Sequence, residues 1–185
     1  QNPANGPMIV TGATGGVGSI AIEMLASKGY DVVAMTGKSD QHDYLRELGA
    51  SEFVDRSSLK MGTRPLEKAL WGGAIDNVGG EVLGWLTRTV RSWGSIASIG
   101  NAGGIKLETT VFPLILRGVS LLGINSIEMS NELRNRAWSR LATDLKPAHL
   151  DMIASRTIDF DRLPEAFGAY IDGGVTGRTV VRIGG

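Results

Sequence analysis

A run of glycines near the start of the chain has the spacing of a phosphate-binding loop. Residues 11–18 read Thr-Gly-Ala-Thr-Gly-Gly-Val-Gly, directly after an apolar run at 8–10 and directly before a stretch with helical periodicity. The first turn of a helix presents unpaired backbone N–H groups, and glycines let a pyrophosphate approach them without a Cβ in the way. We therefore expect dinucleotide binding, with a tight structural turn as the alternative. The residues expected at the pyrophosphate are Thr14, Gly15, Gly16 and Val17.

The glycine run fits two patterns that belong to different classes of reductase. Read as Thr-Gly-x-x-x-Gly-x-Gly from residue 11, it fits the short-chain pattern; read as Ala-x-Gly-x-x-Gly from residue 13, it fits the medium-chain pattern with alanine in the first glycine place. Short-chain enzymes need a lysine four positions after a tyrosine, because the cation lowers the pKa of the phenol for proton transfer. Tyr30, Tyr44 and Tyr170 are followed at that spacing by Ala34, Leu48 and Gly174. The classical short-chain interpretation therefore fails.

The residues after the second predicted strand distinguish NADP from NAD. NAD enzymes place a carboxylate about 20 residues past the glycines, where it accepts hydrogen bonds from the ribose. Here the chain reads Thr36-Gly37-Lys38, with no acidic residue before Asp40. A 2′-phosphate would meet a hydroxyl and a cation at this turn, so we expect NADPH there. Arg56, just after the third predicted strand, is a candidate second cation, with an ordinary solvated arginine as the alternative.

Short β-branched runs alternate with helical patterns, which predicts an α/β fold with a doubly wound, parallel, six-stranded sheet of the Rossmann type. The strands are expected at 8–11, 31–36, 52–54, 74–78, 95–99 and 120–124. The helices are expected at 17–28, 41–48, 81–90, 112–117 and 131–145, the last with Leu133, Ala137, Trp138 and Leu141 inward. A C-terminal strand–helix–strand return follows at about 157–185. Ligands of such sheets bind beyond the carboxyl ends of the strands.

Composition excludes several classes of function. The chain has 19 basic and 19 acidic residues among 185, and the zero net charge disfavours nucleic-acid binding. No apolar run reaches the roughly 18 residues that span a bilayer, and no signal peptide is recognisable, so we expect a cytoplasmic protein. There is no cysteine, and we expect His42 and His149 on the surface without carboxylate partners, hence no metal site. Asp76, at a strand end, is expected to bind nearby backbone N–H groups.

Motifs spread over nearly the whole chain carry a family resemblance. Besides the glycine loop and the Thr-Gly-Lys turn, they are Tyr-Leu-Arg-Glu-Leu-Gly-Ala at 44–50, Arg-Pro-Leu-Glu-Lys at 64–68, Ala-Ile-Asp-Asn-Val-Gly at 74–79, Ile-Leu-Arg-Gly at 115–118 and Gly-Arg-Thr at 177–179. Together they resemble the cofactor domain of medium-chain dehydrogenases/reductases, in the branch of YhdH-type quinone oxidoreductases associated with acrylyl-CoA reduction. The absence of cysteine fits a zinc-independent branch.

The resemblance implies NADPH-dependent hydride transfer to the activated C=C bond of an enoyl thioester, or to a quinone, with the cofactor carrying the chemistry. It implies that Asn101 and Ser126 lie on the nicotinamide side and that Arg178 lies near the phosphates. The alternatives are that Asn101 caps a turn, that Ser126 caps the helix beginning at Asn131, and that Arg178 pairs with Asp172. We assign no catalytic residue, because in this superfamily a substrate domain precedes the cofactor domain and the active site lies between them. We expect that domain to be absent from this chain.

Two further expectations concern function and assembly. A non-catalytic NADPH-binding sensor or assembly module, whose glycine loop remains while its chemistry has gone, is the alternative to an enzyme. The predicted edge strand at 120–124 reads Ser-Leu-Leu-Gly-Ile and carries no charge. Because a bare apolar edge is an aggregation hazard, we expect a homodimer that pairs through this strand.

Overall fold

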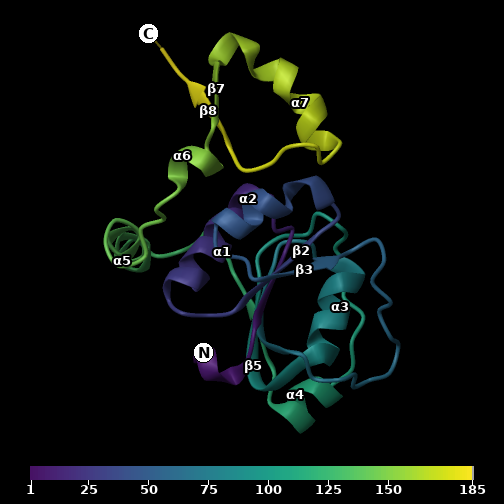
Figure 1. Cartoon of the computed structure of the whole chain (residues 1–185). Helices are drawn as coiled ribbons and strands as arrows, with labels where there is room; N and C mark the ends of the chain where they lie inside the picture. The colour runs from purple at the N-terminus through teal and green to yellow at the C-terminus, as the bar shows by residue number, and fades with distance from the viewer. Residues whose placement is uncertain (185) are drawn as a thin grey trace.

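The computed structural model describes residues 1–184, and a six-stranded parallel sheet forms its centre (Figure 1). The strands are β1 (Met8–Thr11), β2 (Val32–Thr36), β3 (Glu52–Asp55), β4 (Trp71–Asp76), β5 (Val90–Ser98) and β6 (Ser120–Gly123). Their order in the sheet is β3-β2-β1-β4-β5-β6, with every pair parallel. This is the Rossmann order, whose direction of winding reverses between β1 and β4. The predicted fold class is confirmed.

Helices cover both faces of the sheet (Figure 1). They are α1 (Gly16–Ser27), α2 (His42–Glu47), α3 (Gly80–Thr89) and the short α4 (Phe112–Arg117). Successive residues of β1 face opposite layers, as the pleat requires. Ile9 belongs to the apolar cluster that contains Leu86 of α3, whereas Val10 belongs to the cluster that contains Ile22 of α1 and Leu45 of α2. The sheet is therefore buried between two apolar layers.

Beyond β6 the chain leaves the sheet. It continues through α5 (Asn131–Leu141), α6 (Leu150–Ile153), β7 (Arg156–Asp159), α7 (Leu163–Ile171) and β8 (Thr179–Arg182). β7 and β8 form a separate two-stranded parallel sheet, with α7 beside it at the top of Figure 1. Three short 3₁₀ turns, η1 (Pro3–Asn5), η2 (Ser39–Gln41) and η3 (Phe160–Arg162), complete the elements described. The predicted order of strand, helix and strand after residue 157 is confirmed.

The helix α5 differs from the prediction in length and in burial. It ends at Leu141 rather than 145, and Leu133 and Trp138 are 48% and 65% exposed. Of the four residues expected to face inward, only Leu141 is partly covered. The apolar spacing predicted a stripe correctly, but within residues 1–184 no element packs against most of it. α5 instead lies away from the sheet (Figure 1), next to a salt bridge between Asp144 and Lys28, the residue that follows α1.

Two strands also begin earlier than predicted. β4 starts at Trp71 and β5 at Val90, and their register shifts between Trp71 and Gly73. The extra residues include adjacent glycines and polar side chains, which is why the alternation of β-branched residues did not reveal them.

Among residues 1–184, no helix combines the length and apolar character needed to cross a membrane.

Candidate functional site

The glycine loop connects β1 to α1 at the carboxyl end of the sheet. Gly12 has a φ of +58°, and its carbonyl accepts a hydrogen bond from the N–H of Gly15 at 3.0 Å, which closes the turn. Gly15 is the N-cap of α1 and supplies no capping side chain. A Cβ on Gly18 would overlap the Gly12 carbonyl oxygen, so α1 packs directly on the loop. The start of α1 thus leaves its first backbone N–H groups available to an anion.

A buried hydrogen-bond network holds the loop against β4. The Asp76 carboxylate is fully buried and accepts hydrogen bonds from the Thr11 hydroxyl at 2.7 Å and from the N–H of Gly79 at 2.9 Å. The side-chain amide of Asn77 donates to the Thr11 carbonyl at 2.8 Å. The expectation that Asp76 binds nearby N–H groups is confirmed. These contacts join the ends of β1 and β4, where the sheet reverses its direction of winding, and so give the loop a rigid base.

A cavity of about 470 Å³ lies over the glycine loop. Its lining residues are Gly12, Thr14, Gly15, Gly16, Val17, Gly18, Lys38, Asn77, Ile99, Gly100, Asn101, Ala102, Gly173, Val175 and Arg178. The lining contains two cationic side chains and no carboxylate. Backbone N–H groups, a helix start and two cations together suit an anionic ligand such as a pyrophosphate.

Lys38 enters this cavity from the turn after β2. The hydroxyl of Thr36 accepts a hydrogen bond from the Lys38 N–H at 3.0 Å, which shapes the turn. The ammonium of Lys38 donates to the carbonyl of Val175 at 3.0 Å. Thr36 is buried in the protein, whereas Gly37, the next residue of the turn, is exposed to solvent. The lysine therefore spans from the sheet to the C-terminal part of the chain.

Arg178 reaches the loop from the C-terminal part. The N–H of Gly177 donates to the carbonyl of Thr14 at 2.8 Å, and Gly15 and Gly177 form a parallel bridge. The side chain of Arg178 crosses over Gly16, because a Cβ on Gly16 would overlap it. Among residues 1–184, no ion pair involves Arg178, so the alternative pairing with Asp172 is not formed.

Three predicted site residues remain to be placed. Asn101 lines the cavity, whereas Arg56 and Ser126 do not. The N–H of Arg56 donates to the Thr36 carbonyl at 3.2 Å, but Arg56 lines a separate hollow with Glu81, which shares no residue with the cavity over the glycine loop. Ser126 is exposed in the loop after β6 and is not part of the lining, and the N-cap of α5 is Ser130.

Besides Gly12 and Gly18 of the glycine loop, six lining residues were not predicted as site residues: Asn77, Ile99, Gly100, Ala102, Gly173 and Val175. Asn77 follows Asp76 at a strand end, a position that could have indicated it. Val175 contributes its carbonyl, and Gly173 lines the cavity without a side chain. A valine carbonyl carries no signal for phosphate binding, and Gly173 lies far from the glycine loop in the sequence, so spacing could not have found either residue.

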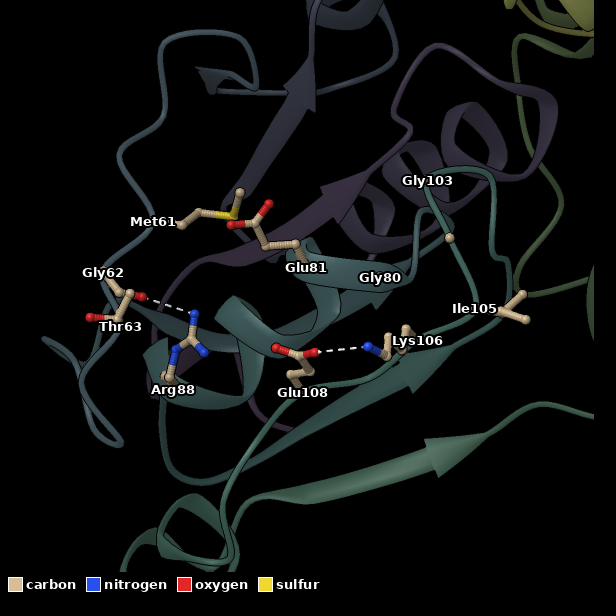
Figure 2. A pocket seen from close by; sticks show the side chains of 11 residues that line it. Met61, Gly62, Thr63, Gly80, Glu81, Arg88, Gly103, Ile105, Lys106 and Glu108 are labelled. Atoms are coloured by element: carbon tan, nitrogen blue, oxygen red, sulfur yellow. Dashed lines mark hydrogen bonds and ion pairs between the residues drawn. The ribbon is translucent and has the colours of Figure 1, made fainter.

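A second cavity, of about 550 Å³, lies beside α3 (Figure 2). Figure 2 shows Lys106 pointing toward Glu108, 3.4 Å between nitrogen and oxygen, and Arg88 donating to the Gly62 carbonyl at 2.9 Å. Glu81 brings the lining to two acids and two bases. Because its charges balance, this cavity suits a phosphate less well than the one over the glycine loop.

The histidines were predicted incorrectly in one respect. Nδ1 of His149 lies 2.7 Å from Oε1 of Glu23, a carboxylate in the middle of α1, so His149 does have an acidic partner. The two residues are far apart in the chain, and local spacing could not reveal the pair. His42 stacks on Phe53 with ring centroids 4.1 Å apart. Within the described part of the chain, no group of three or more His, Cys, Asp or Glu side chains could hold a metal ion.

Comparison with known proteins identifies the family. The model of the zinc-binding dehydrogenase family matches residues 16–143, from the start of α1 to just beyond α5. The chain belongs to the zinc-binding dehydrogenase family. The donor set of residues 1–184 does not itself fit the zinc of that family name, because the chain has no cysteine and its two histidines contact different partners.

Curated relatives of this family member are 42–44% identical to it. It is 44% identical over 183 residues to "Putative quinone oxidoreductase YhfP" of Bacillus subtilis and 42% identical over 182 residues to acrylyl-CoA reductase AcuI of Ruegeria pomeroyi. The alignments cover 98% of this chain and 56% and 55% of those proteins. The chain thus spans about half the length of the curated relatives that it matches. The resemblance stated from the motifs is confirmed.

Solved structures agree with the fold of this family member. Escherichia coli YhdH with bound NADPH superposes with a TM-score of 0.93 at 42% identity, covering 99% of this chain and 56% of that one. Bacillus subtilis YhfP with NAD bound superposes with a TM-score of 0.94 at 43% identity, with the same coverage. The two relatives therefore hold different dinucleotides on closely similar folds.

Proposed function

We propose that this chain is the cofactor-binding part of an NADPH-dependent oxidoreductase. The observation that carries the proposal is one cavity that combines the uncapped start of α1, the Arg178 guanidinium and the Lys38 ammonium without any carboxylate. In this proposal residues 14–17 and Arg178 bind the pyrophosphate, and residues 36–38 bind the 2′-phosphate, with Arg56 beside them. NADPH bound to E. coli YhdH supports it.

The proposed substrate is an activated C=C bond of an enoyl thioester, or a quinone. The bound cofactor supplies the hydride, and this chain holds and orients it. Asn101 and Ser126 follow β5 and β6, at the carboxyl edge where the nicotinamide is expected to lie. The name of AcuI supports the enoyl thioester, and the name of YhfP supports the quinone. We assign no catalytic residue within this chain. We further propose that the reaction does not depend on zinc and that the protein is cytoplasmic.

Calorimetric titration of the chain with NADPH and with NADH tests the proposal. We expect NADPH to bind at least about tenfold more tightly, which corresponds to about 1.4 kcal/mol. Equal affinities would contradict the 2′-phosphate site. This arm of the test matters because the YhfP structure holds NAD on a closely similar fold. Failure to bind either dinucleotide would contradict the proposed function of the chain as a whole.

We also propose a homodimer that pairs through β6. β6 is an edge strand, and the side chains of Leu122 within it and Ile124 just after it are 49% and 43% exposed. We predict that the chain sediments as a dimer at micromolar concentration and that Leu122→Lys makes it a monomer, because a charge on an edge strand opposes pairing. The control is Ile171→Lys on α7, where an equally apolar side chain is 83% exposed away from β6. A wild-type monomer, or a Leu122→Lys dimer, would contradict the proposal.

A further inference from the structure

Glu23 is a buried carboxylate in the middle of α1 that does not line the cofactor cavity. It is 6% exposed, and its Oε1 accepts hydrogen bonds from the N–H groups of Ala148 at 2.7 Å and His149 at 2.8 Å. The same oxygen lies 2.7 Å from Nδ1 of His149. Burial of a carboxylate is costly unless it is well hydrogen-bonded. All of the contacts that offset that cost hold the segment at 148–149 against α1.

The segment that Glu23 holds leads directly into α6. The carbonyl of His149 accepts a hydrogen bond from the N–H of Ile153 at 3.0 Å, which closes the single turn of α6. The side chain of Ile153 is 1% exposed and belongs to the apolar cluster that contains Val10 of β1 and Ile22 of α1. Its carbonyl accepts a hydrogen bond from the N–H of Arg178 at 2.7 Å. A continuous path of short contacts therefore joins Glu23 to the backbone of Arg178.

Gly177 shows how little freedom this junction has. Its φ is +67°, and a Cβ at this position would overlap the carbonyl oxygen of Ile153. On its other side, the N–H of Gly177 donates to the carbonyl of Thr14 in the glycine loop. The backbone before Arg178 is thus fixed between α6 and the loop, with the guanidinium over Gly16. Movement of α6 would move that guanidinium.

We propose that Glu23 is a positioning residue for the cofactor pyrophosphate, acting through the 148–153 segment on the Ile153 carbonyl that holds Arg178 over the glycine loop. The inference rests on the proposed function, because it needs Arg178 to contact the phosphates. The pyrophosphate is common to NADPH and NADH. Loss of Glu23 must therefore weaken the binding of both dinucleotides by the same factor, whereas loss of Lys38 must change their ratio.

A double-mutant cycle between Glu23 and Arg178 tests the inference. Titration with NADPH and NADH is compared for the wild-type chain, Glu23→Ala, Arg178→Ala and the double variant. We expect Arg178→Ala to weaken both dinucleotides about tenfold and Glu23→Ala to weaken both by about three- to tenfold, with their affinity ratio unchanged. In the Arg178→Ala background, Glu23→Ala should add less than about a twofold change.

Rescue and a matched control separate positioning from general stabilisation. Glu23→Gln keeps an acceptor oxygen for both N–H groups and should recover most of the affinity. Lys28→Ala is the control, because Lys28 also joins α1 to the segment after α5, through Asp144, but its side chain is exposed and lies off the path. It should leave both affinities unchanged. If Glu23→Ala does not fold, Glu23→Asp, which keeps the charge but is one methylene too short, takes its place.

The outcomes distinguish this inference from the proposed function. Wild-type affinity in Glu23→Ala, or in Glu23→Asp where it takes the place of Glu23→Ala, would overturn the inference and leave the cofactor site intact. Losses that multiply independently in the double variant would do the same. A wild-type chain that binds neither dinucleotide, or an Arg178→Ala variant that binds both as tightly as wild type, would overturn the phosphate site on which the inference rests.

Discussion

Replacement of Lys38 with alanine is expected to abolish the preference of the chain for NADPH over NADH. Lys38 lies two residues after the end of β2 and lines the cavity, whose lining contains no carboxylate. A charge-assisted contact to a doubly charged phosphate is expected to contribute about tenfold or more in affinity, or about 1.4 kcal/mol. NADPH should therefore lose that factor while NADH changes little, as measured by titration calorimetry with both dinucleotides.

The contact between Lys38 and Val175 makes this result informative in both directions. Because the ammonium donates to the Val175 carbonyl, the lysine could instead act as a brace for the C-terminal part. A brace would affect NADPH and NADH equally, and that result would contradict the 2′-phosphate site. Lys60→Ala is the matched control, because Lys60 is an exposed lysine beyond β3 that does not line the cavity. It should change neither affinity.

Substitution of Gly18 with alanine is expected to destabilise the chain and to abolish dinucleotide binding. By helix propensity alone, alanine would stabilise α1 by about 1 kcal/mol. Its Cβ, however, would overlap the Gly12 carbonyl oxygen and would lie 2.8 Å from the Cα of Ala13, and both atoms belong to the backbone. Overpacking against backbone that cannot move costs about 3 kcal/mol, so the clash outweighs the propensity. Chemical denaturation and NADPH titration measure the two effects.

Two other glycines separate the causes of that effect. Gly168 lies in α7, and no neighbouring atom lies within 4 Å of the position that a Cβ would occupy there. Gly168→Ala should therefore raise the free energy of unfolding slightly. The three atoms nearest to a Cβ at residue 16 all belong to the side chain of Arg178, which can move. Gly16→Ala should weaken cofactor binding while the free energy of unfolding stays near that of the wild type. A Gly18→Ala variant that is stable and binds NADPH would contradict the packing described for the loop.

Local patterns predicted the sheet and one half of the site. β1, the glycine loop and α1 are consecutive in the chain, so spacing alone defined them, and the Thr36–Lys38 turn follows from the end of β2. The C-terminal half of the site depends on contacts between residues far apart in the chain. That Arg178 lies over Gly16 could be expected only from a family resemblance, and the contact of Lys38 with Val175 involves a carbonyl that every residue possesses.

The failures have a common physical origin. Periodicity shows which face of a helix is apolar but not whether another element covers that face. The pattern therefore predicts burial for a stripe of α5 that is exposed. The partner of His149 was missed because Glu23, on α1, looks like an ordinary helical acid in the sequence. Both errors concern tertiary contacts of the segment after β6, where the chain leaves the regular alternation of strands and helices.

The bridge between Gly15 and Gly177 also has a consequence for biosynthesis. A nascent chain can assemble β1, α1 and β2 early, but the loop meets Gly177 and Arg178 only after most of the remaining chain has left the ribosome. Until then the cavity over the glycine loop lacks the lining that Gly173, Val175 and Arg178 supply. If the proposed cofactor binds only the complete cavity, it stabilises chains in which these residues are in place over shorter ones by mass action. Cofactor binding would then depend on a part of the chain that is synthesised long after the sheet has begun to form.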